Sequence, residues 1–133
     1  MSNIHGPNMV TNGMVACWDV GNRVSYPGAG TTITDLVGSS NGTLTNGPTF
    51  DSANLGSIDF DGANDYIDVG NASSLQITSA ITLAAWYRTS SAGNDTLVAK
   101  FSADGSQKAY KLRMNSSTMR AVFSANGSAN TVS

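Results

Sequence analysis

Residues 57–69 read SIDFDGANDYIDV, and this stretch decides the expected fold. Apolar and polar residues alternate from Ser57 to Asp61 and again from Tyr66 to Val69, which is the period of a half-buried strand. The residues between the two runs, Gly62–Asp65, have the composition of a tight turn. The stretch therefore predicts a β-hairpin whose two strands pair across this turn.

The same pattern of short apolar runs separated by Gly, Asn and Ser continues on both sides of this stretch. Ser, Thr, Asn and Gly make up 58 of the 133 residues, Glu is absent, and no segment keeps a helical period. These residue types favour turns and caps over helix interiors. We therefore expect an all-β chain, with further strands at residues 14–20, 31–36, 43–45, 81–89, 96–101, 109–114 and 119–125.

The alternation within these strands also predicts the core. Residues 81–89 carry apolar side chains at both parities, which is typical of a central strand covered on both faces. Truncation of Phe60 to Ala is expected to cost about 3–5 kcal/mol of folding free energy. The predicted core residues are Trp18, Leu44, Ile58, Phe60, Ile67, Leu83, Leu112 and Phe123.

The first twelve residues are polar and interrupted by Gly6-Pro7, so they are expected to form an arm that precedes a domain at residues 13–133. The start of the chain lacks the charged and apolar regions of a signal peptide. No apolar run approaches the roughly 20 residues of a membrane span, so we expect no membrane insertion. A lone Cys17 cannot form an internal disulfide, and with a single His5 it cannot build a zinc cluster.

Charge is distributed unevenly along the chain. Residues 1–80 hold seven Asp and one Arg, for a net charge of −6, whereas residues 81–133 hold six Lys or Arg and two Asp, for +4. The formal net charge of the whole chain, −2, argues against nucleic acid as a partner. The opposite signs of the two halves are suited to a head-to-tail contact between copies of the chain.

Five segments in this order resemble a known superfamily. They are residues 13–19 (GMVACWD), 25–32 (SYPGAGTT), 41–50 (NGTLTNGPTF), 56–67 (GSIDFDGANDYI) and 81–86 (ITLAAW). Together they look like the concanavalin A-like lectin/glucanase superfamily. More narrowly, they resemble the LamG-type jelly-roll domains of phage and marine viral structural proteins.

The resemblance implies an antiparallel jelly-roll sandwich of two curved sheets, here without the closing strands that usually follow. It also implies a non-enzymatic virion protein, either a capsid decoration protein or a tail or fibre module. Its partners would be other virion proteins and copies of itself. The alternative is a carbohydrate-binding adhesin that recognises cell-surface glycans. An open sheet edge near Ala125 and the arm are expected to favour assembly with other chains.

No catalytic residue is expected. Glycosidases of the superfamily use a Glu-x-Asp-x-Glu strand, and its nearest imitation here is Asp59-Phe60-Asp61, which a half-exposed strand explains better. A Ser-His-Asp triad would need His5, which lies in the expected arm. Neither a cofactor nor a metal is expected. Calcium at Asp61, Asn64 and Asp65 stays open, although a plain turn is the simpler interpretation.

Two further features are candidates for binding. Trp86 is a possible platform for sugar rings, but core packing is the favoured interpretation because the resemblance places a structural Trp there. Basic side chains also cluster on the hairpin predicted at residues 109–125. This cluster consists of Lys108, Lys111, Arg113 and Arg120. It faces an acidic glycan, an acidic partner surface or solvent.

Overall fold

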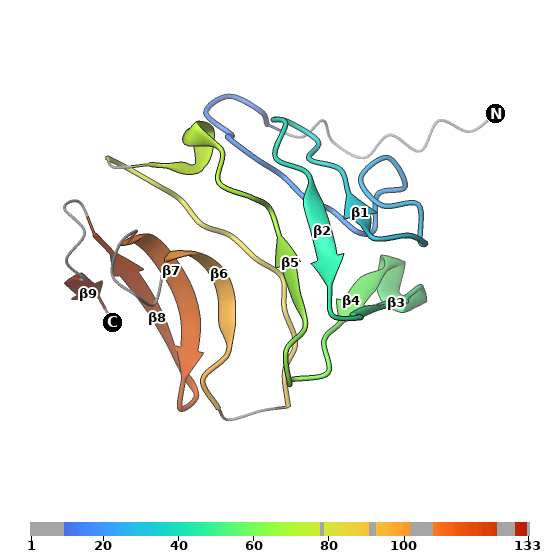
Figure 1. Ribbon diagram of the computed structural model, residues 1–133. Helices are drawn as coiled ribbons and strands as arrows, with labels where there is room; N and C mark the ends of the chain where they lie inside the picture. Colours follow the sequence, from blue (N-terminus) through green and yellow to red (C-terminus); the bar gives the residue numbers. More distant parts are fainter. Residues whose placement is uncertain (1–9, 78, 91–92, 102–107, 125–129, 133) are drawn as a thin grey trace. The chain divides into compact units, whose positions relative to one another are not determined.

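The computed structural model describes residues 10–77, 79–90, 93–101, 108–124 and 130–132. These residues form antiparallel sheets with almost no helix (Figure 1), so the all-β prediction is confirmed. The chain divides into two compact units, residues 1–72 and residues 73–133, and each is described by itself. The prediction of one sandwich over residues 13–133 stays a prediction. None of the helical turns in the described part of the chain has the length and apolar character of a bilayer span.

The first unit contains two small antiparallel sheets. One has β2 between β1 and β5, and the other pairs β3 with β4. The strands predicted at residues 31–36 and 43–45 are present as β1 and β2. The strands are β1 (Thr32–Ile33), β2 (Gly42–Thr45), β3 (Thr49–Asp51), β4 (Ser57–Asp59) and β5 (Tyr66–Asp68), with the 3-10 helix η1 (Ala53–Leu55) between β3 and β4.

The hairpin predicted at residues 57–69 is wrong. β4 pairs with β3, where Ile58 lies opposite Phe50, whereas β5 pairs with β2, where Ile67 lies opposite Leu44. The turn after β4 therefore joins strands of two different sheets. Alternation located both strands, but it could not assign their partners, because any strand with the same period fits the same ladder.

The core of the first unit is built on Tyr26, Ile33 and Leu44, of which Ile33 is the most deeply buried. The rings of Tyr26 and Phe50 meet edge to face with 5.4 Å between their centroids. Such a pair adds about 0.5–1.5 kcal/mol beyond the burial itself. Partly buried apolar side chains pack around this centre, and they are Trp18, Val20, Phe50, Ile58 and Ile67.

Phe60 does not belong to this core, contrary to the prediction. Its side chain is 50% exposed. The residue follows the last residue of β4, Asp59, so the ladder no longer directs its side chain inward. Because only about half of the side chain is buried, Phe60→Ala is now expected to cost less than the ~3–5 kcal/mol predicted from the sequence.

Residues 14–20 form no strand, although a strand was predicted there. The carbonyl of Cys17 accepts the N–H of Leu36 at 2.8 Å, as in a ladder. The N–H of Cys17, however, donates to the side chain of Asp35 at 2.9 Å. A carboxylate thus takes the place that a strand carbonyl would fill. The alternation still predicted correctly that Trp18 packs against the core.

The second unit contains a four-stranded antiparallel sheet in the order β6-β7-β8-β9 (Figure 1). The strand predicted at residues 96–101 and the hairpin predicted at residues 109–125 are confirmed as β6 and as β7 with β8. The hydroxyl of buried Tyr110 donates to the carbonyl of Leu75 at 3.0 Å. The elements are the 3-10 helix η2 (Ser73–Leu75) and the strands β6 (Thr96–Phe101), β7 (Lys108–Asn115), β8 (Thr118–Phe123) and β9 (Asn130–Val132).

The turn between β7 and β8 consists of two residues, Ser116 and Ser117, with φ of 46° and 67°. Positive φ at both central residues gives the turn the twist that two right-twisted strands require. The turn therefore fixes the register of the hairpin, with Arg113 opposite Arg120 and Leu112 opposite Ala121.

Residues 81–89 belong to no sheet, so the predicted central strand is wrong. Ile81 and Leu83 are half-buried, but Trp86 is fully exposed and Tyr87 is 42% exposed. Because residues 81–89 have apolar side chains at both odd and even positions, the segment was expected to be covered on both faces. The pattern failed here because the apolar residues near the end of the segment lie at the surface.

A further correction concerns the edge of the sheet. The edge of β8 was expected to be open near Ala125, but β9 pairs with β8 along Ala121, Val122 and Phe123. The sequence before β9 is rich in Asn, Ser and Gly, and this composition predicted only a loop. From Ala121 to Phe123, β8 therefore has a strand partner on both sides.

The contrast between Leu44 and Leu55 tests the described core. Leu44 is 8% exposed, whereas Leu55 is 89% exposed. Leu44→Ala should lower the free energy of unfolding by about 2–5 kcal/mol, because it removes buried methyl groups and leaves a cavity. Leu55→Ala makes the same chemical change at the surface and should stay within about 0.5 kcal/mol of wild type. Urea unfolding of both variants checks this, and equal effects would contradict the core.

Candidate functional site

A buried carboxylate organises the loops of the first unit. Asp35 is 6% exposed, and its Oδ1 accepts the N–H of Cys17 at 2.9 Å and the N–H of Val37 at 3.1 Å. Its Oδ2 accepts the N–H of Ser40 at 3.2 Å. Buried charges persist in proteins only when such donors compensate for the lost water. The carboxylate therefore holds residues 35–40 against a segment far away in sequence.

The pKa of the Asp35 carboxyl reflects two opposing causes. Burial raises this pKa, because it disfavours the charged form. Hydrogen bonds from the backbone of Cys17, Val37, Gly38 and Ser40 lower it, and together they outweigh burial, so the pKa lies below its ordinary value of 3.8. Asp35 is thus ionised at neutral pH and serves as a structural anchor.

Gly38 is required beside this anchor. A Cβ built on Gly38 would lie 2.7 Å from Oδ2 of Asp35 and 2.7 Å from the carbonyl oxygen of Val15. The second of these atoms belongs to the backbone and cannot easily move aside. Only glycine allows this close approach of the loop to the carboxylate.

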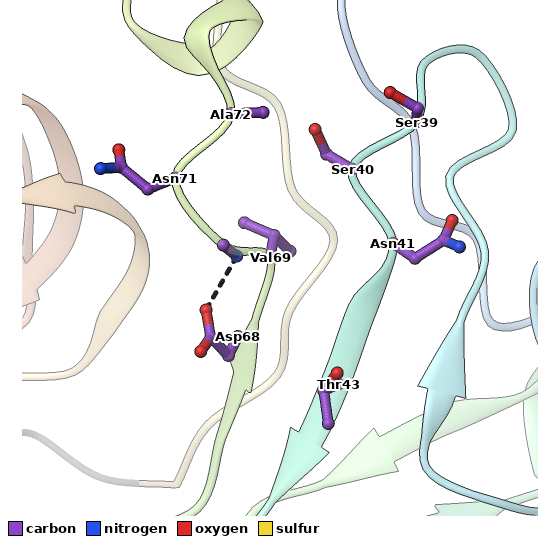
Figure 2. Close-up of a pocket in the computed structure, with 9 residues that line it drawn as sticks. Ser39, Ser40, Asn41, Thr43, Asp68, Val69, Asn71 and Ala72 are labelled. Atoms are coloured by element: carbon purple, nitrogen blue, oxygen red, sulfur yellow. Dashed lines mark hydrogen bonds between the residues drawn. The ribbon is translucent and has the colours of Figure 1, made fainter.

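The loop held by Asp35 forms one side of a shallow polar hollow of about 390 Å³, and residues 68–72 form the other (Figure 2). Oδ1 of Asp68 accepts the N–H of Gly70 at 2.8 Å, which orients the carboxylate at the end of β5 (Figure 2). The hollow is lined by Ser39, Ser40, Asn41, Thr43, Asp68, Val69, Gly70, Asn71 and Ala72.

Two of the lining residues hold the hollow in place. Oδ1 of Asn41 accepts the N–H of Asp35 at 3.0 Å, and the carbonyl of Ser40 accepts the indole N–H of Trp18 at 2.7 Å. The lining offers hydroxyl and carboxylate groups but no aromatic face. It suits hydrogen bonds to a small polar group, such as a hydroxyl. The sequence predicted only a turn before β2. The hollow forms because β5, which is distant from this turn in the sequence, pairs with β2.

Of the aspartates considered for catalysis or calcium, Asp59 ends β4, and Asp61 and Asp65 lie in the turn that follows. Oδ1 of Asp61 accepts the N–H of Ala63 at 2.8 Å, and Oδ2 of Asp65 accepts the N–H of Asp61 at 3.1 Å. Asp59 and Asp61 are both exposed. Within the described ranges, no group of three or more His, Cys, Asp or Glu side chains could hold a metal ion. Asn64 contributes its carbonyl, which accepts an N–H of the Asn46 amide at 2.7 Å.

The indole of Trp86 lies at the surface, so the favoured interpretation as a core residue is wrong. It is fully exposed, and the adjacent Tyr87 is also exposed. A tryptophan buries a large apolar area when it meets a partner, which is why exposed Trp and Tyr side chains mark contact sites. The structure thus leaves the ligand-contact interpretation of Trp86 standing.

The basic residues of the second unit are brought together in part. Lys111, Arg113 and Arg120 share one face of the β7–β8 ladder, because Arg113 lies directly opposite Arg120 and Lys111 is two residues from Arg113. The side chain of Lys108 lies outside the described residues. Like charges directly opposite each other destabilise a ladder. The direct opposition of the two arginines was not foreseen, because it depends on the register that the two-residue turn imposes.

Two remaining candidates give little chemistry. His5 and most of the expected arm lie outside the described residues. Cys17 is a free, half-buried thiol, and its pKa is raised by burial and further by the nearby charges of Asp19 and Asp35. A raised pKa keeps the thiol protonated and unreactive.

Comparisons with models of known protein families, with curated proteins and with solved structures find no match for this chain. The resemblance to LamG-type domains therefore stays an expectation from the sequence.

The Asp35 anchor predicts how stability depends on pH. Asp35→Asn should lower the free energy of unfolding by about 1–3 kcal/mol at pH 7, because buried backbone donors lose a charged acceptor. A carboxyl whose folded pKa is depressed stabilises the fold above its unfolded pKa, and this contribution is lost as the pH falls through the folded pKa.

The deficit of Asp35→Asn should therefore be full at pH 7 and shrink below the ordinary value of 3.8. Chemical denaturation at several pH values measures it. Asp19→Asn, which changes an exposed carboxylate, is the control. A deficit that stays constant down to acidic pH would contradict the anchor.

Proposed function

We propose that this chain is a non-enzymatic structural module of a virus particle, built as a lectin-like jelly-roll sandwich. It acts through contact area, as a capsid decoration protein or as part of a tail or fibre. Its partners are copies of itself and other proteins of the particle. The viral setting and the jelly-roll topology come from the resemblance of five ordered segments to LamG-type domains.

The exposure of Trp86 is the observation that carries the contact function. Large apolar side chains cluster at protein interfaces, and Trp is the residue most enriched among those that dominate binding energy. Tyr87 beside it extends the apolar surface. A contact built on this segment would bury the indole, which otherwise remains in water.

A second function is favoured by the same side chain. An exposed indole also stacks on the apolar face of a sugar ring. Independently, the hollow of the first unit, lined by Ser39, Ser40 and Asp68, offers hydrogen-bonding groups to a polar ligand. The alternative is therefore a carbohydrate-binding adhesin. The two functions differ in what binds: other chains in the first, and isolated glycans in the second.

Trp86→Ala separates these functions. If the chain acts by protein contact, the variant should weaken self-association or binding to particles by roughly thirtyfold, the factor that corresponds to about 2 kcal/mol. Leu55→Ala removes an exposed apolar side chain of the other unit and should leave binding unchanged. Sedimentation velocity and co-sedimentation with purified particles measure both effects.

A wild-type chain that stays monomeric at high concentration and binds no particle protein would contradict the structural function. Glycan binding by that monomer, lost in Trp86→Ala, would establish the adhesin instead. A circular dichroism spectrum identical to that of the wild type confirms that each variant keeps its fold.

A further inference from the structure

We infer that the cross-strand pair Arg113 and Arg120 binds the carboxylates on the outward face of the β3–β4 hairpin of a second copy. This inference rests on the proposed function, because it specifies one of the contacts through which copies would meet. It assigns the basic side of that contact to β7 and β8 and the acidic side to β3 and β4.

The register places the two arginines side by side. Arg113 lies directly opposite Arg120 in an antiparallel ladder, so their Cα atoms are roughly 4.5–5.5 Å apart. Lys111 lies on the same face, opposite Val122. Two guanidinium groups held this close repel each other unless an anion lies between them.

The Nε–H groups of both arginines lack a hydrogen-bond partner within the described part of the chain. Each Nε–H is buried and donates to no acceptor there. A buried donor without an acceptor costs free energy, so most such groups in proteins are paired. Arginine binds carboxylates through two parallel hydrogen bonds, and a carboxylate placed between the two guanidinium groups would compensate their like charges.

The β3–β4 hairpin carries a matching set of carboxylates. Thr49 lies opposite Asp59 and Asp51 opposite Ser57, so these four residues share one face, and all four are exposed. Asp51 and Asp59 are therefore diagonal neighbours, roughly 7–8 Å apart. The Asp59 carboxylate has no hydrogen bond or ion pair within the described residues, so it is available to a partner.

Charge complementarity selects a second copy as the occupant. The residues up to 80 carry a net charge of −6 and those from 81 onward carry +4, so each copy offers both an acidic and a basic surface. Opposite surfaces on the same chain produce a head-to-tail contact, which can repeat into rings or filaments. Such repetition is what a module that coats or extends a particle requires.

The test breaks each side of the contact separately. Arg120→Glu places a carboxylate opposite Arg113, so it neutralises the pair from within the chain and should not weaken the fold. Asp59→Lys places a positive charge beside Asp51 and so neutralises the acidic face. For each variant alone, the Kd of self-association should rise by roughly tenfold or more. An equimolar mixture should form a one-to-one complex, since each variant retains the surface that the other lacks.

Matched controls change the same charges elsewhere. Arg88→Glu and Asp19→Lys alter exposed side chains outside both faces and should keep wild-type association. Association of the wild type should weaken as sodium chloride is raised, because salt screens the charges. Circular dichroism and thermal melting confirm that each variant folds, and sedimentation velocity reports the species formed.

The possible failures are distinguishable. If wild type associates and Arg120→Glu associates equally well, the arginine pair is not the contact, although the proposed function stands. If both variants are monomeric and their mixture is also monomeric, the head-to-tail pairing is wrong. If the sedimentation of the wild type changes with sodium chloride but not with protein concentration, the ion pairs lie within one chain and the inference is overturned. Loss of alginate binding in Arg120→Glu, with self-association intact, would assign the pair to an acidic polysaccharide instead.

Discussion

The hydrogen bonding of the Asp35 carboxylate is the constraint on which the first unit depends. A buried charge must be compensated by donors, and here they come from the loop that contains Asp35 and from Cys17, which lies 18 residues earlier. The segment around Cys17 therefore lies where the carboxylate needs it, without forming a strand. In consequence Trp18 packs against the core and its indole N–H reaches the carbonyl of Ser40.

This arrangement links the interior to the surface. The same loop supplies Ser39, Ser40 and Asn41 to the polar hollow (Figure 2). The buried carboxylate of Asp35 therefore helps to set one wall of that hollow. The exposed face of β3 and β4 carries carboxylates, and one face of β7 and β8 carries half-buried arginines.

The sequence predicted strands better than it predicted their partners. Period-2 alternation located β4 and β5, but their pairing with β3 and β2 depends on residues distant in the chain. The β7–β8 hairpin was predicted correctly because its pairing is local and its turn has two residues. Residues 14–20 failed as a strand because a side-chain acceptor replaced a ladder carbonyl, which no periodicity records.

For the candidate sites too, the sequence showed which residues are present but not how distant segments arrange them. The basic residues were visible in the sequence, but the direct opposition of Arg113 and Arg120 follows from register alone. Trp86 was expected in the core, and its exposure depends on which segments cover it. The hollow could not be foreseen, since its two walls come from residues 39–43 and 68–72, which only the pairing of β2 with β5 brings together.

The central claim, that copies of this chain function by contacting one another, is tested most directly by zero-length cross-linking. Light and heavy isotope-labelled chains are mixed, and a carbodiimide joins carboxylates to amines that already form ion pairs. The account predicts mixed-isotope cross-links between Lys111, on the face of the arginine pair, and the aspartates of β3 and β4. Cross-links confined to chains of a single isotope, even at high protein concentration, would contradict it.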